Sequence, residues 1–101
     1  MPFGDFVNQI PPIGFLAIHL VAFGLAAWFA RRAFATGSQG LGWGFALFGL
    51  GEISYMTYHL DWTTFLFAHT ISEVLVLLAF VSVFVAAVQR GREPLGAAVR
   101  G

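Results

Sequence analysis

The sequence predicts an all-α integral membrane protein with three transmembrane helices. Of its 101 residues, 58% are hydrophobic and only 10% are charged, and the mean hydropathy is +0.81. In a soluble domain of this size, about a quarter of the residues are charged. The apolar residues form three stretches, each close to the ~20 residues that a helix needs to cross a bilayer. We expect one domain over residues 1–101, because no segment is polar enough to form a second.

The expected spans cover residues 13–30, 41–60 and 64–88. Pro11 and Pro12 introduce the first span, because proline is tolerated at the start of a helix, and two arginines end it. The second span follows the turn-like sequence ATGSQG. Gly91 and Pro94 end the third span, and the residues from about Gly91 onward are expected to form a polar cytoplasmic tail.

The distribution of arginines predicts the orientation. All of them follow the first or the third span, namely Arg31, Arg32, Arg90, Arg92 and Arg100. In a chain with three spans these positions lie on one side, which the positive-inside rule makes cytoplasmic. The opposite side holds Asp5 and Asp61 and no arginine. We therefore expect the N-terminus outside and the C-terminus in the cytoplasm, in a bacterial inner membrane.

Composition excludes several classes of function. The chain has no cysteine, which excludes disulfide scaffolds, zinc knuckles and thiol redox chemistry. Its five basic residues balance five acidic ones, so no basic patch for nucleic acid is expected. The sequence contains no recognisable nucleophile–base pair, phosphate loop or soluble catalytic domain, so we do not expect an enzyme.

Small residues recur at the spacing that allows transmembrane helices to approach closely. Ala22, Ala26 and Ala30 follow one another every four residues in the first span. Gly40 and Gly44 do so near the start of the second. This pattern favours close contact between helices.

Ionisable side chains gather in the outer half of the predicted bundle. At about 1.5 Å per residue, His19 and His69 lie roughly 8–10 Å below the outer boundary, and His59 lies near it. Glu52 and Glu73 lie about 10–15 Å deep. A charged side chain at mid-bilayer costs at least about 2.5–3.5 kcal/mol, so intramembrane ionisable residues are candidates for a functional site.

Helical spacing places these residues on two stripes that we expect to face each other. The second span carries Glu52, Tyr55, Met56 and His59 at i, i+3, i+4 and i+7, and the third carries His69, Ser72 and Glu73 at i, i+3 and i+4. Asp61 or Thr63, in the hairpin between these spans, is expected to cap the third helix. The sequence thus predicts one polar cluster.

Four interpretations of the cluster stay open. In the first, Glu52 and Glu73 share hydrogen bonds with His69 and Tyr55, join the second and third helices, and bind nothing. In the second, the neutral imidazoles of His19 and His69 are axial ligands of haem iron or chlorophyll magnesium. The two histidines would then ligate the metal of one tetrapyrrole from its two sides, or each would ligate a tetrapyrrole of its own.

The other two interpretations use the same side chains differently. A transition metal such as Zn, Cu or Fe would take nitrogen and carboxylate ligands from His59, His69, Glu73 and Glu52. Alternatively, the glutamates and histidines would relay protons or ions. Beyond Glu73 the third span has Ser82 as its one polar residue, which argues against an autonomous channel.

The segment AIHLVAFGLAAWFARR resembles the single span of bacterial light-harvesting antenna polypeptides. Those polypeptides carry a histidine followed by leucine, with a tryptophan some nine residues later, and His19, Leu20 and Trp28 match that pattern. The resemblance covers these sixteen residues, and Phe15 stands where those polypeptides usually have alanine. It implies a bacteriochlorophyll ligated by His19, with Trp28 donating a hydrogen bond to the pigment.

Size and composition favour a protein that works as part of a larger assembly. Three helices are too few to enclose a tetrapyrrole, so such a ring would lie on the flank of the bundle, under a neighbour. We expect a small non-catalytic accessory subunit of an energy-transducing complex, photosynthetic or respiratory, embedded in lipid beside larger subunits. The alternative is a self-associating membrane protein with a His/Glu metal or proton site.

Overall fold

Residues 3–92 are described by the computed structural model, and they form one short 3-10 helix and three α-helices. These elements are η1 (Asp5–Gln9), α1 (Pro12–Ala35), α2 (Gln39–His59) and α3 (Phe65–Arg92). No strand occurs within these residues, so the all-α prediction is confirmed. The three α-helices coincide with the predicted spans, although α1 and α3 each run several residues further. The predicted tail, with Arg100, lies outside the described residues except for Gly91 and Arg92, which end α3.

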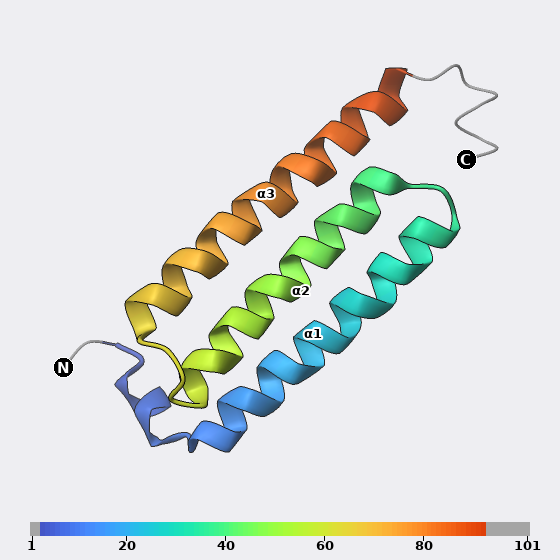
Figure 1. Ribbon diagram of the computed structural model, residues 1–101. Helices are drawn as coiled ribbons and strands as arrows, with labels where there is room; N and C mark the ends of the chain where they lie inside the picture. The colour runs from blue at the N-terminus through green and yellow to red at the C-terminus, as the bar shows by residue number, and fades with distance from the viewer. Residues whose placement is uncertain (1–2, 93–101) are drawn as a thin grey trace.

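The three helices run up, down and up, and α2 lies between α1 and α3 (Figure 1). α2 packs along both of its neighbours. The α1–α2 turn lies at one end of the bundle, and η1 and the α2–α3 hairpin lie at the other (Figure 1). This order places the start of α1, the end of α2 and the start of α3 at the same end.

α1 and α3 are, within the described part of the chain, the two helices long and apolar enough to cross a membrane. Only 11% of the most apolar stretch of each is buried inside the molecule, whereas the core helix of a soluble protein would be mostly buried. α2 does not reach the same hydropathy because glycines and polar residues interrupt its apolar sequence. α2 lies between two helices, so much of its surface faces protein (Figure 1).

Glycines on two faces of α2 allow both neighbours to approach its backbone. A Cβ atom added to Gly40 would lie 2.6 Å from the Cβ of Ala86 on α3. One added to Gly42 would lie 2.5 Å from the ring of Phe34 on α1. The surfaces that α1 and α3 turn inward are also built from small residues, and the buried hydrophobic residues are all alanines: Ala26, Ala30, Ala33, Ala68 and Ala79. Close contact through small residues, as predicted, thus holds the bundle together.

The α2–α3 hairpin closes tightly. Asp61 has a φ of 63°, a left-handed conformation that aspartate tolerates better than most residues. Thr63 was an expected cap for α3, but its hydroxyl oxygen lies 3.0 Å from that of Thr57 on α2. Neither Asp61 nor Thr63 makes a side-chain hydrogen bond to the α3 backbone in the described structure; the carbonyl of Thr64 accepts the first bond, from Ala68.

Candidate functional site

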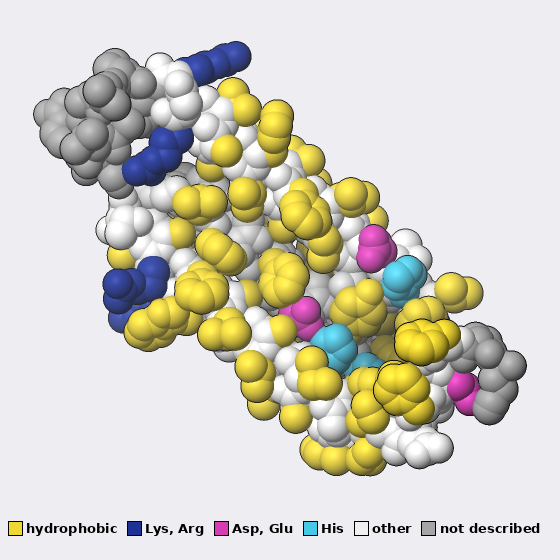
Figure 2. Space-filling view, turned by 180° about the vertical axis from the view of Figure 1, so that it is seen from behind, with side chains coloured by type: hydrophobic (Ala, Val, Ile, Leu, Met, Phe, Trp, Pro, Cys, Tyr) yellow, Lys and Arg dark blue, Asp and Glu magenta, His cyan; other side chains and the backbone are white. Residues whose placement is uncertain are grey.

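Histidines and carboxylates gather toward the hairpin end of the molecule, and arginines gather at the opposite end (Figure 2). His19 comes from α1, His59 ends α2, and His69 lies near the start of α3. Because these helix segments meet at one end of the bundle, three histidines far apart in the sequence come together. The predicted grouping is therefore present for the three histidines, whereas Glu73, which was expected to belong to it, is exposed outside it.

His19 is the best-held side chain of the group. Its Nδ1 pairs with Oε2 of Glu52, and the two side chains are only 19% and 14% exposed. The His19 ring is stacked between those of Tyr55 and His59, with centroid separations of 5.2 Å to each. Phe15 continues the column by stacking on His59 at 5.0 Å. With His19 neutral, Nδ1–H donates to Glu52, and Nε2 carries the lone pair that can bind a ligand.

Tyr55 connects this column to α3. Its hydroxyl oxygen lies 3.2 Å from Nδ1 of His69, and the ring of Phe65 stacks on His69 at 5.3 Å. Tyr55 therefore contacts a histidine of each neighbouring helix. A single tetrapyrrole held by both His19 and His69 would have to displace Tyr55, so the arrangement fits one ligand per histidine better.

Small hydroxyl side chains fasten α2 to α3 beside the cluster. Ser54 donates to the carbonyl of Ala68 at 2.9 Å, and Ser72 donates to the carbonyl of Gly51 at 3.1 Å. Both serines are buried. Both bonds join the helices that carry Tyr55 and His69, within one helical turn of these residues. They therefore set the position of Tyr55 along the bundle axis relative to His69.

The glutamates of α2 and α3, Glu52 and Glu73, have different surroundings. Glu52 pairs with α1 through His19, so the expectation that it joins α2 to α3 is wrong in this respect. Glu73 is exposed on α3 and makes no hydrogen bond or ion pair within residues 3–92. For a helix embedded in a bilayer, an unpaired charge costs about 2.5–3.5 kcal/mol at the centre. The surface around Glu73 thus differs from an ordinary lipid-facing surface.

The structure does not gather the four predicted metal ligands into one group. His59 stacks on His19, His69 bonds Tyr55, Glu52 pairs with His19, and Glu73 is exposed elsewhere. No three histidine, aspartate or glutamate side chains in the described ranges are placed to hold a metal ion. The metal site remains a prediction from sequence spacing.

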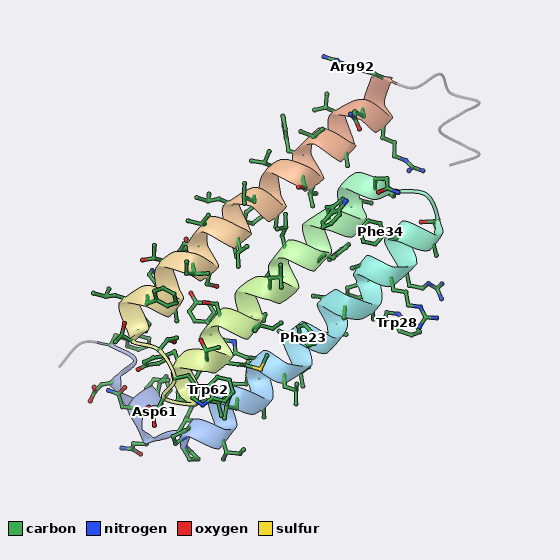
Figure 3. All side chains as sticks on the ribbon, in the orientation of Figure 1. Phe23, Trp28, Phe34, Asp61, Trp62 and Arg92 are labelled. Atoms are coloured by element: carbon green, nitrogen blue, oxygen red, sulfur yellow. The ribbon has the colours of Figure 1, made fainter. Side chains whose placement is uncertain are left out.

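Trp28 lies apart from the cluster. It is 56% exposed, and the Arg32 guanidinium stands over its ring at 5.8 Å from the centroid. Figure 3 shows it on the side of α1 that points away from α2. Nine residues of helix place it about 13 Å along the axis from His19. A pigment would have to extend along α1 to contact both residues.

An open apolar groove of about 470 Å³ continues from the cluster toward the arginine end. α1 and α3 form its walls and α2 its floor. Its lining includes Ala22, Ala26, Gly44, Phe48, Val76 and Ala79. Phe48 lies one helical turn from Glu52, and Ala22 lies one turn from His19, so the groove and the cluster occupy successive positions on the same helix faces.

Sequence reasoning missed the aromatic residues that surround the histidines. Phe15 and His19 are four residues apart, as are Phe65 and His69. Residues at this spacing lie on one face of a helix. That signal was present, and it would have placed both phenylalanines in the cluster.

No protein-family model matches the chain, and comparisons with curated proteins and with solved structures give no match either. The likeness of α1 to antenna polypeptides therefore stays a prediction based on His19, Leu20 and Trp28. What the site can do follows from its own side chains. These are two acid–base pairs, His19–Glu52 and Tyr55–His69, joined by ring stacking.

Proposed function

We propose that the chain is a bacterial inner-membrane protein with three spans, its N-terminus outside and its C-terminus in the cytoplasm. The length, hydropathy and exposure of α1 and α3 support two spans. α2 runs between them over a similar length, so in this proposal it also crosses the bilayer, and its two neighbours shield it from much of the lipid. The arginines of the described residues lie at one end (Figure 2), and η1 with Asp5 and the α2–α3 hairpin with Asp61 lie at the other (Figure 1), which supports the orientation.

The protein acts as a small non-catalytic accessory subunit of a larger photosynthetic or respiratory complex. Large apolar side chains are exposed along α1 and α3, for example Val21 at 63% and Phe84 at 67%. Such surfaces suit contact with lipid and with larger membrane subunits. The apolar groove beside the polar cluster is open, which suits a partner-dependent role.

His19 is the proposed axial ligand of a tetrapyrrole, either bacteriochlorophyll or haem, in the outer half of the membrane. The observation that carries this proposal is the pairing of Nδ1 with Glu52. Histidines that ligate metals commonly donate their second ring N–H to a carboxylate, which orients the ring and fixes its tautomer. Axial ligation uses the Nε2 lone pair, which lies in the plane of the His19 ring, whereas Tyr55 and His59 stack on that ring. His69, oriented by Tyr55, is the second candidate ligand.

The test is an absorption spectrum of the protein purified gently from its native membrane, with metal analysis on the same sample. We expect a Soret or near-infrared band that is lost in His19→Leu/Glu52→Leu, a double variant that leaves no carboxylate unpaired. The matched control is His59→Leu, which changes the neighbouring ring of the same column and should keep the band. A band that survives loss of His19 would reject this residue as the ligand.

A proton site in a self-associating protein is the second candidate. It is favoured by the continuous series of titratable groups from Glu52 through His19 and Tyr55 to His69. Reconstitution into liposomes with an internal pH dye tests it. Proton flux above that of protein-free vesicles, abolished by Glu52→Gln, is the expected result; flux equal to the protein-free control would reject this candidate.

A further inference from the structure

α3 carries a regular stripe of exposed side chains, one of which, Phe80, also lines the edge of the apolar groove. The stripe consists of Leu66, Thr70, Glu73, Leu77, Phe80 and Phe84, at successive intervals of four, three, four, three and four residues. Every one of these residues is exposed. Alternating intervals of three and four place side chains in the narrow seam along which two helices pack at a small crossing angle. We call these six residues the α3 stripe.

Glu73 is near the middle of the α3 stripe and is its only charged member. Its neighbours are strongly apolar: Leu66 is 73% exposed, Leu77 is 61% exposed and Phe80 is 69% exposed. Glu73 follows Phe65, the first residue of α3, by eight residues, or about 12 Å of helix. A surface that contacted only acyl chains would gain nothing from a carboxylate at this depth, because lipid offers it no hydrogen-bond donor.

The charges of this chain indicate what kind of helix covers the stripe. Arg90 follows Glu73 by seventeen residues, or about 25 Å of helix. The other described arginines, Arg31, Arg32 and Arg92, lie near the C-terminal ends of α1 and α3, at the same end of the bundle as Arg90 (Figure 1). A second copy inserted in the same orientation therefore brings no arginine to the depth of Glu73.

We propose that the α3 stripe is the docking face for a membrane-spanning helix of a different protein, which places a basic side chain opposite Glu73. This inference rests on the proposed accessory role and specifies the surface and the charge by which the subunit is held. The apolar members of the stripe supply close packing, and Glu73 sets the depth and identity of the partner helix. A charged pair inside the membrane excludes helices that lack the complementary group.

Photo-crosslinking in native membranes tests this inference. A photoreactive amino acid replaces Thr70 or Leu77 in the tagged chain, and Val21, exposed on α1, receives it as the control. After irradiation, the crosslinked peptides are identified by mass spectrometry. We expect Thr70 and Leu77 to capture a transmembrane peptide of another protein with Arg or Lys within one helical turn of the crosslink, and Val21 not to capture that peptide.

Variants of Glu73 show whether the charge matters. Glu73→Leu should lower the yield of this crosslink about tenfold at equal amounts of inserted chain. Glu73→Gln, which retains a hydrogen-bond acceptor, should lower it about threefold. If Glu73→Leu does not accumulate in the membrane, Glu73→Gln decides the question.

Several results would overturn the docking face. These are crosslinks to lipid only, to a second copy of this chain, or to a helix with no basic residue at that depth, and yields that do not respond to Glu73. A native gel of the unmodified protein distinguishes this failure from failure of the accessory role. Migration with a large complex would retain the accessory role, whereas migration alone would remove it.

Discussion

The half of the bundle next to the α2–α3 hairpin (the hairpin half) and the half next to the α1–α2 turn (the arginine half) use the same faces of the same three helices. The side chains fill the space between the helices differently in the two halves. In the hairpin half, rings from every helix meet, and Tyr55 contacts both His19 and His69. In the arginine half, small residues such as Ala22 and Ala79 leave a groove of about 470 Å³. There α1 and α3 come close to the backbone of α2 at its glycines, and ring contacts such as Phe29–Phe45 add to the packing of α1 on α2.

This difference separates two ways of stabilising a small helical bundle. The hairpin half depends on specific polar partners, so deletion of one partner leaves another polar group without its bond. The arginine half depends on short distances between backbones, so added volume forces helices apart. Deletions should therefore weaken the first half, and additions should weaken the second.

Removal of His19 alone should have the largest effect. His19→Leu leaves the partly buried Glu52 carboxylate without its partner, and we expect a loss of about 2–3 kcal/mol in the free energy of unfolding in detergent micelles. The double variant His19→Leu/Glu52→Leu should recover most of that loss, because no charge remains unpaired. A double variant as unstable as His19→Leu would mean that ring stacking, and not the His19–Glu52 hydrogen bond, is the dominant interaction.

Addition of a methyl group in the arginine half should rank second. Gly40→Ala brings a Cβ to 2.6 Å from the Cβ of Ala86, and neither atom can turn away. We expect a loss of about 1–2 kcal/mol in the same unfolding assay. Gly24→Ala on α1 is the matched control, since no atom lies within 4 Å of its added Cβ. Its higher helix propensity should leave stability equal or slightly raised, and equal losses in both variants would contradict the close-approach argument.

Loss of one hydroxyl should have the smallest effect. Tyr55→Phe removes the hydrogen bond to His69 but keeps the stacking on His19, so we expect a loss of about 0.6 kcal/mol. Tyr58→Phe is the control, because the Tyr58 hydroxyl makes no hydrogen bond within residues 3–92 while its ring packs on His59 and Phe65. Nitrogen chemical shifts of His69 should change in Tyr55→Phe and not in Tyr58→Phe.

The helices and the joint position of the polar residues were predictable because both follow from local rules. Apolar length identified the three helical segments, and spacing placed Tyr55 and Glu52 on one stripe. Alternation of chain direction then brought His19, His59 and His69 to one end. None of these steps requires knowledge of which helices touch.

The partner of Glu52 was not predictable by the same rules. A stripe on a helix that has two neighbours can face either one, and the sequence did not indicate that α2 lies in the middle. The glycines contained part of this information, since Gly40 meets α3 while Gly42, two residues later, meets α1. Glycines on opposite sides of one helix indicate two close neighbours, but the rotation that directs Glu52 to His19 depends on packing of all three helices.

The low hydropathy of α2 has a consequence for biogenesis under the proposed topology. Inserted alone, a segment with a glutamate and several glycines partitions poorly into lipid, whereas α1 and α3 partition well. α2 therefore has to enter the bilayer against a neighbouring helix that is already inserted, so it inserts and packs in a single step. A change at the α2 contacts would then appear in cells as chains with the wrong number of spans and not as correctly threaded chains of lower stability.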